Sequence, residues 1–188
     1  MKKKLKGILR NDFDAFKDIA LFSGAKQLEL ILKISFLRNR YYPNLATILY
    51  YRKARWHLIN NNKFRYFYYT LRLRRYRAKT GIDLSPQTDI GSPFLFVHLG
   101  PRVIANSAII GNNCRIFPGV TIGGYKSRNK EEGSPVIGNN VSIRANAVVV
   151  GKIRIGNNVN IGANCFVNFD IPDGASVISS GIIIKQKK

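Results

Sequence analysis

Two histidines are the side chains of this 188-residue chain best suited to move a proton near neutral pH, and they lie in different surroundings. His98 follows the apolar segment Phe94-Leu-Phe-Val, whereas His57 lies beside Trp56 in a basic, aromatic stretch. A neutral imidazole can take a proton from a hydroxyl group. We interpret His57 as structural. For His98 two interpretations remain, a general base or a surface histidine without a chemical role.

The residues around His98 follow a six-residue period. An aliphatic or aromatic anchor recurs at Leu84, Ile90, Phe96, Ile104, Ile110, Ile116, Ile122, Ile137, Ile143, Val149, Ile155, Ile161 and Val167. Two intervals are irregular, because Phe96 to Ile104 spans eight positions and Ile122 to Ile137 spans fifteen. His98 therefore lies on a bulge, and residues 123–136 form an excursion loop. Interruptions of a regular scaffold often carry function.

This period predicts a mainly β fold, a parallel β-helix of hexapeptide repeats. Positions i and i+4 share one face of a strand, so both point into the coil. Gly and Asn follow the anchors in three copies of Ile-Gly-Asn-Asn, at i+1 and i+2, where corners need tight or left-handed conformations. No coil buries enough apolar surface alone, so stability comes from stacked neighbours. The pattern leaves the handedness open.

Residues 1–80 instead predict an α-helical N-terminal domain. Asn44 is expected to cap a helix that continues through Leu45 and Ile48. A last helix would use an apolar set inside a field of arginines: Phe64, Phe67, Tyr68, Leu71 and Tyr76. The β-helix is then expected over residues 81–171, with a C-terminal tail at 172–188.

The charge is concentrated in this first domain. The chain carries +21, and residues 1–79 hold 20 of its 31 Lys and Arg but 4 of its 10 acidic residues. Such an excess attracts a phosphorylated cofactor, a lipid surface, an acidic polymer or nucleic acid. The basic, Tyr-rich helix is either a cap with packed aromatic rings and solvated arginines or a surface for anionic headgroups. No nucleic-acid motif accompanies it, so nucleic acid is not the expected partner.

The remaining composition bears on compartment. No secretory signal is visible, and the apolar stretch Leu28 to Leu37 is too short to span a bilayer. We expect a cytoplasmic protein that contacts the inner membrane peripherally. Cys114 and Cys165 both fall at inward i+4 positions, which indicates small core residues; a disulfide or metal pair is the alternative. No metal is expected.

From Gly81 onward the chain resembles the serine acetyltransferase branch of the left-handed β-helix, hexapeptide-repeat acyltransferases. The motifs that match in order are Thr80-Gly-Ile-Asp83 with Pro86, Phe94-Leu-Phe-Val-His98, Ile104-Ala-Asn-Ser-Ala108, Ile110-Gly111 and Val120-Thr-Ile-Gly-Gly124. Tyr42-Pro43 and Tyr51-Arg52 with Trp56 are similar to the family's helical domain, so the resemblance covers about 145 residues. It implies a left-handed β-helix and acetyl-CoA as the acyl donor.

The resemblance also implies roles for single residues. His98 matches the family's general base, and Asp83 matches the carboxylate that orients it. Gly123 and Gly124 open the loop over the site. Ala145 and Ala163 match positions whose backbone amides face the pantetheine arm of the cofactor, in a groove between subunits. A homotrimer or a dimer of trimers is therefore implied.

The chain departs from the family at four places on the substrate and cofactor side. The second carboxylate that holds the substrate has no counterpart in the N-terminal region. The family's second histidine, before the Pro that follows the loop, is replaced by Ser134. An aspartate that holds the amine of serine is replaced by Val97, which cannot pair with an ammonium group. The C-terminal Gly-x-Pro-Ala segment is replaced by Ser180-Gly-Ile-Ile-Ile184.

Because of these departures, three functions are weighed. The main prediction is an acetyl-CoA-dependent O-acetyltransferase that acts on a hydroxyl of a sugar or surface-polysaccharide precursor. The first alternative is serine O-acetyltransferase, the first step toward cysteine. The second alternative is a catalytically silent trimeric β-helix scaffold.

Overall fold

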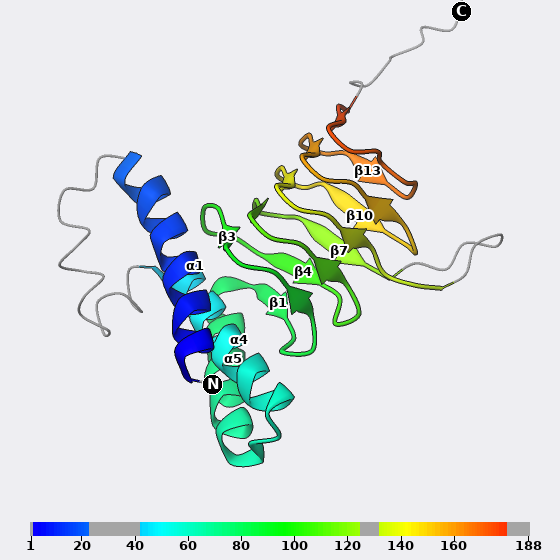
Figure 1. The fold of residues 1–188 in the computed structure, drawn as a ribbon. Coiled ribbons are helices and arrows are strands. Elements are labelled where there is room, and N and C mark those ends of the chain that lie inside the picture. Colours follow the sequence, from blue (N-terminus) through cyan, green and yellow to red (C-terminus); the bar gives the residue numbers. More distant parts are fainter. Residues whose placement is uncertain (1, 23–41, 125–131, 180–188) are drawn as a thin grey trace, which may run out of the picture.

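The computed structural model describes residues 2–22, 42–124 and 132–179 as helices followed by a parallel β-helix (Figure 1). The helices are α1 (Lys2–Phe22), α4 (Pro43–Ile59) and α5 (Lys63–Thr80). They lie at the end of the β-helix where it begins, and the last coils point away from them (Figure 1). The helical segment and the β-helix meet at Gly81, whose left-handed conformation (φ 69°) ends α5.

Three parallel sheets form the sides of the β-helix, and each is built from strands of successive coils. The first sheet contains β1 (Ile82–Leu84), β4 (Arg102–Ile104), β7 (Thr121–Gly123), β10 (Val148–Val150) and β13 (Phe166–Val167). The second contains β2 (Asp89–Ile90), β5 (Ile109–Ile110), β8 (Val136–Ile137) and β11 (Arg154–Ile155). The third contains β3 (Phe94–Phe96), β6 (Cys114–Ile116), β9 (Ser142–Ile143), β12 (Asn160–Ile161) and β14 (Ser176–Val177). The strand β14 continues the stack into the segment predicted as a tail.

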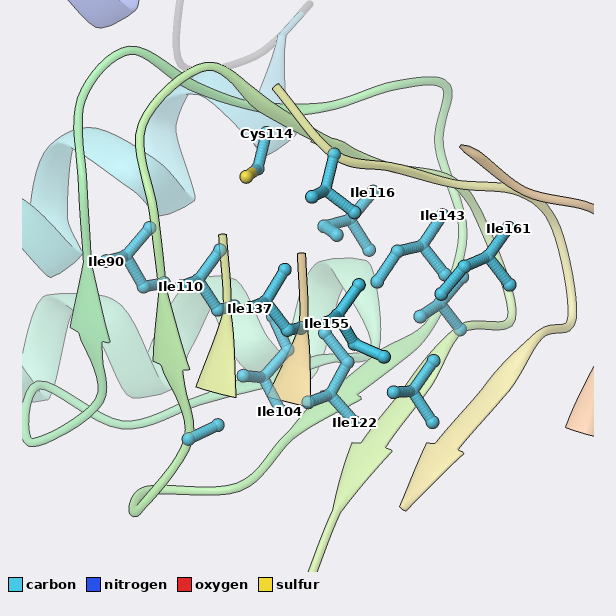
Figure 2. Close-up of a cluster of buried hydrophobic side chains, with 14 of the residues drawn as sticks. Ile90, Ile104, Ile110, Cys114, Ile116, Ile122, Ile137, Ile143, Ile155 and Ile161 are labelled. Carbon is cyan, nitrogen blue, oxygen red and sulfur yellow. The ribbon is translucent and has the colours of Figure 1, made fainter. Parts of the chain in front are cut away.

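The predicted anchors fill the interior. All thirteen are buried, and they stack in columns because strands of neighbouring coils pair in register, as in Ile90↔Ile110 and Ile110↔Ile137. Figure 2 shows the isoleucines of the three sheets converging on one axis. Both cysteines lie in this core with free thiols, which confirms their interpretation as small core residues. The predicted hexapeptide β-helix is therefore confirmed.

The Ile-Gly-Asn-Asn corners work differently from the prediction. The left-handed conformation lies at the second Asn, as at Asn113 (φ 55°) and Asn140 (φ 58°), not at the Gly. The Gly is required for another reason: a Cβ on Gly111 would lie 2.5 Å from the Gly138 carbonyl oxygen of the next coil. The middle Asn stacks instead, and Asn139 Oδ1 accepts the Asn112 amide at 2.8 Å. Glycine thus permits close stacking of coils here.

The helices α4 and α5 pack against each other, with the Tyr50 and Tyr76 rings stacked at 5.2 Å. The helix α5 buries Leu73 and Tyr76, whereas Phe64, Phe67, Tyr68 and Leu71 lie exposed on its other side. The interpretation that these four aromatic and aliphatic groups pack in a cap is wrong, because α5 contacts α4 through the opposite face. Within the described ranges, no helix is long and apolar enough to cross a membrane.

A buried ion pair fastens the helices to the first coil. Asp12 of α1 is buried, and its Oδ2 accepts a hydrogen bond of 2.7 Å from Nε of Arg52 on α4. Asp12 Oδ1 also accepts the Phe94 amide at 2.9 Å, and Arg52 donates to the Ile90 carbonyl. One carboxylate and one guanidinium therefore join α1, α4 and the entry to β3.

Candidate active site

His98 lies in the predicted bulge, at the corner between β3 and β4. Its backbone is left-handed (φ 58°), a conformation that is uncommon for a residue with a side chain and often marks a functional position. Its ring is exposed and lies edge-on to Phe117, with 6.0 Å between centroids. The bulge thus turns an imidazole outward from a coil whose anchor side chains fill the core.

Arg102 holds this bulge from inside the coil. It takes the inward position at the start of β4, in register with buried Ile82, and it is 1% exposed. Its guanidinium donates to the carbonyl groups on both sides of the corner and on the next coil: Val97, His98 (2.8 Å), Gly100 (2.8 Å), Ile116 (3.2 Å) and Phe117 (3.1 Å). The Ile116 carbonyl also accepts the Val97 amide, but the bulge leaves the His98 and Gly100 carbonyl groups without strand partners, and one fork-shaped donor reaches them all.

The charge on Arg102 is compensated by these dipoles and by the Phe96 ring, whose centroid lies 5.1 Å from the guanidinium carbon. No carboxylate of the described residues pairs with it. Burial lowers the pKa of Arg102 to about 10, because the apolar interior disfavours the charged form. Sequence reasoning missed this residue, although a cation at an inward position of a hexad is a visible departure from the pattern.

A second support reaches the bulge from the helices. Asn44 was predicted to cap α4, but the helix begins at Pro43, whose fixed φ suits the first helical position, with Tyr42 as the flanking residue. Asn44 lies one residue further on, is buried, and donates from Nδ2 to the His98 carbonyl. The first turn of α4 therefore contacts the main chain of the candidate base.

Asp83, the predicted partner of His98, lies on β1 and faces outward. Its Oδ2 accepts a hydrogen bond of 2.7 Å from Nη2 of Arg77 on α5, and both side chains are about half-exposed. No hydrogen bond or ion pair of the described residues joins Asp83 to His98. Its role as an orienting carboxylate stays a prediction.

The other predicted residues fall on two edges of the prism, on either side of the first sheet. His98, Ala145 and Ala163 lie at the corners that lead from the third sheet into the first. Gly124 and Ser134 lie at the corner that leads from the first sheet into the second, and Gly123 ends β7 just before it. Ser134 Oγ lies 2.7 Å from Ser107 Oγ. Val97 lies beside His98, and its amide donates to the Ile116 carbonyl at 3.0 Å.

Two predicted features are not placed. Most of the excursion loop, residues 125–131, and the segment from Ser180 lie outside the described residues.

A surface cavity of about 620 Å³ lies along the late coils of the second sheet, lined in part by Arg154, Asp170 and Asp173. It contains none of the predicted site residues.

The match to known proteins covers both the repeat and the helices. Residues 134–168 match the model of the family "Bacterial transferase hexapeptide (six repeats)". A serine acetyltransferase of Helicobacter pylori is 35% identical over 139 residues, which are 74% of this chain and 79% of that protein. The chain belongs to the serine acetyltransferase branch of the hexapeptide-repeat acyltransferases.

Solved structures of this family agree. The chain superposes on Entamoeba histolytica serine acetyltransferase isoform 3, in complex with cysteine, with a TM-score of 0.71 and 29% identity, over 98% of this chain and 61% of that one. For the Neisseria gonorrhoeae serine acetyltransferase in complex with serine, the TM-score is 0.70 and the identity 25%, over 94% of this chain and 67% of that one. A serine acetyltransferase in complex with CoA gives 0.61 and 25%, over 74% of this chain and 57% of that one. The left-handed form of the β-helix, expected from the resemblance, is therefore confirmed.

These relatives correct the predicted acceptor. The expectation of a sugar or surface-polysaccharide hydroxyl is wrong, because the relatives are serine acetyltransferases and the matching structures hold serine or cysteine. That inference relied on two missing carboxylates, the one replaced by Val97 and a second that holds the substrate, and these do not make up the whole recognition surface. Membership of the family also favours an acyltransferase over a silent scaffold.

Proposed function

We propose that this protein transfers the acetyl group of acetyl-CoA to the hydroxyl oxygen of L-serine. The observation that carries the proposal is the 35% identity to a serine acetyltransferase over 74% of the chain, including the bulge that holds His98. The CoA-bound and serine-bound relatives support the same pair of substrates.

In this proposal His98 is the general base. Its neutral imidazole removes the proton of the serine hydroxyl while the oxygen forms a bond to the thioester carbonyl carbon. The carbon–sulfur bond of the tetrahedral adduct then breaks, and the departing CoA thiolate receives the proton from the imidazolium. The products are O-acetylserine and CoA, and no other reactant is required.

The two edges described above support a site shared between subunits. His98, Ala145 and Ala163 lie on one edge and Gly124 and Ser134 on another, with the first sheet between them. A homotrimer would bring the first edge of one protomer against the second edge of its neighbour. We propose that acetyl-CoA lies in that seam, near Ala145 and Ala163, and that Ser134 belongs to the acceptor side.

The test compares the two histidines. His98→Ala should lower kcat for acetyl transfer to L-serine by roughly 10²-fold or more. The matched control is His57→Ala, since His57 lies on α4 with its ring stacked on Tyr69 at 5.5 Å. Release of the CoA thiol is measured with saturating L-serine. No turnover of L-serine by the unmodified protein, or equal activity of the two variants, would reject the proposal.

A further inference from the structure

The helix α5 has a second apolar face that nothing in the described chain covers. Its buried face packs through Leu73 and Tyr76. On the opposite side lie Phe64 (85% exposed), Phe67 (68%), Tyr68 (48%) and Leu71 (56%). These four follow the i, i+3, i+4, i+7 spacing that aligns side chains on one helical face. Large apolar groups gathered in this way mark an interaction surface, unlike scattered single ones.

Cations border this apolar stripe on both sides. The eighteen residues of α5 include seven Lys and Arg and no acidic residue. Each residue of a helix is rotated by about 100° from the one before it. This rotation places Lys63 and Arg74 on one side of the apolar stripe and Arg65 on the other side. Arg75 lies on the stripe itself, beyond Leu71. All four are exposed, and none of them forms an ion pair among the described residues. Arg72 and Arg77 are already used, by the Tyr50 hydroxyl and by Asp83.

We propose that this face of α5 is a docking surface for an anionic lipid bilayer, in which the helix lies parallel to the membrane plane. The aromatic rings and Leu71 would enter the boundary between headgroups and acyl chains, and the flanking cations would contact lipid phosphates. The α4–α5 hairpin lies at the end of the molecule away from the last coils, so the outer coils would face the solvent (Figure 1).

Charge decides between this occupant and a second copy of the chain. Two copies of the α5 face would place the four cations along one stripe against the four of the other, and α5 contains no acidic residue to pair with either set. An anionic bilayer instead supplies phosphates for the cations and an apolar layer for Phe64 and Phe67. The proposal is independent of the acetyl transfer reaction.

The experiment is flotation of the full chain with vesicles. Partitioning onto vesicles of phosphatidylcholine and phosphatidylglycerol should exceed that onto phosphatidylcholine alone by about tenfold or more. Arg74→Gln with Arg75→Gln should lower it by roughly tenfold or more, and Phe64→Ser with Phe67→Ser by about tenfold. The matched controls are Arg115→Gln with Arg154→Gln and Phe166→Ser with Phe169→Ser, which change exposed residues of the β-helix and should leave partitioning unchanged.

Four outcomes would overturn the proposal. The first is absence of binding to both kinds of vesicle. The second is an equal loss in the α5 variants and in their controls, which would indicate attraction by net charge alone. The third is a change of molar mass in light scattering for Phe64→Ser with Phe67→Ser at unchanged vesicle binding, which would assign the face to a second copy. Retention of single-stranded DNA without vesicle binding would assign it to nucleic acid and likewise reject the lipid.

Discussion

Two buried arginines stabilise the first coils of this protein, and they do so in different ways. Arg52 comes from α4 and pairs with a buried carboxylate, Asp12, which belongs to α1. Arg102 comes from β4 and pairs with no carboxylate of the described residues; it binds main-chain carbonyl groups instead. The first arginine joins separate elements, and the second shapes one corner.

This difference follows from what each site must satisfy. Joining α1 to the β-helix needs a contact that only one arrangement of the helices can make, and a buried ion pair is sensitive to loss of either partner. The bulge has another requirement, since its extra residues leave several carbonyl oxygens without donors. A carboxylate beside Arg102 would occupy donors that these oxygens need. We infer that Arg102 has no carboxylate partner because the irregular main chain around His98 needs its donors.

The largest expected effect is the loss of Asp12. In Asp12→Ala the guanidinium of Arg52 remains buried without its counter-ion, and the free energy of unfolding should fall by roughly 3–5 kcal/mol. Urea denaturation followed by circular dichroism measures it. The matched control is Asp14→Ala on the same helix, because Asp14 forms an exposed 3.6 Å pair with Arg10 and should cost about 0–1 kcal/mol. Equal costs for the two variants would contradict the role given to the buried pair.

Removal of Arg102 should lower the free energy of unfolding less than removal of Asp12 does, but it should also slow acetyl transfer. Arg102→Met removes a buried cation that has no carboxylate partner and also leaves buried carbonyl oxygens without donors, so the net loss should be roughly 2–4 kcal/mol. Because the corner that holds His98 loses its donors, kcat should fall by roughly 10²-fold at a temperature where the variant is folded.

Two further variants distinguish positioning from folding. Arg102→Lys keeps the charge but not the fork of donors, and it should recover stability more fully than kcat. Arg115→Met, at an exposed position of β6, should change neither. A variant of Arg102 that loses stability while kcat stays unchanged would show that the arginine serves the fold alone.

The third prediction uses opposite shifts of pKa in the two regions. Burial raises the pKa of Tyr51, beside Arg52, from 10.0 to about 12, against the opposing effect of the nearby arginines. The unfolded chain therefore loses this proton first, and the stability that Tyr51 contributes below pH 10 declines as the pH rises toward 12. For Arg102 the pKa of about 10 lies below the unfolded value of 12.5, so its contribution to stability increases above pH 10.

These signs predict opposite pH dependence for two variants. Between pH 8 and pH 11 the cost of Tyr51→Phe should fall by about 1 kcal/mol, and the cost of Arg102→Met should rise by about 1 kcal/mol. Urea denaturation at the two pH values gives both differences, and the unmodified protein measured alongside removes the effect of other titrating groups. If the costs of the two substitutions changed with pH in the same direction, Tyr51 could not be a buried phenol and Arg102 a buried cation without a carboxylate partner.

The sequence predicts the regular part of the molecule and misses what makes each region irregular. The anchors from Leu84 to Val167 follow from periodicity, because each repeats the same local contact. The bulge at His98 is visible as a change of spacing. Arg102 is visible only as a cation at an inward position, and its role is not, because a charged residue usually indicates solvent and only tertiary contacts supply the buried partners of Arg102 and Asp12.

The acceptor shows the same limit. Val97 replaces a carboxylate and Ser134 replaces a histidine that the family uses, yet the overall match favours serine. In the proposed trimer, recognition would depend on the whole surface around His98, including a second edge of the prism contributed by a neighbouring protomer. Single positions in the sequence do not describe that surface.

The smallest expected effect concerns Asn44, which connects the two regions. It belongs to α4, as Arg52 does, and it donates to the same His98 carbonyl that accepts from Arg102. Asn44→Ala should lower the free energy of unfolding by about 1 kcal/mol, because Arg102 still satisfies that oxygen.

A double-mutant cycle then separates the regions. Asn44→Ala combined with Arg102→Lys should deviate from additivity by about 0.5–1 kcal/mol, since both changes weaken donors to one carbonyl oxygen. Combined with Asp14→Ala, a site on α1 with no shared partner, the costs should add within about 0.5 kcal/mol. Additivity in both cycles would mean that α4 and β4 hold the bulge independently. A larger deviation in the first cycle would instead make the His98 carbonyl the point at which helix docking and the candidate base are coupled, because no other described acceptor receives both side chains.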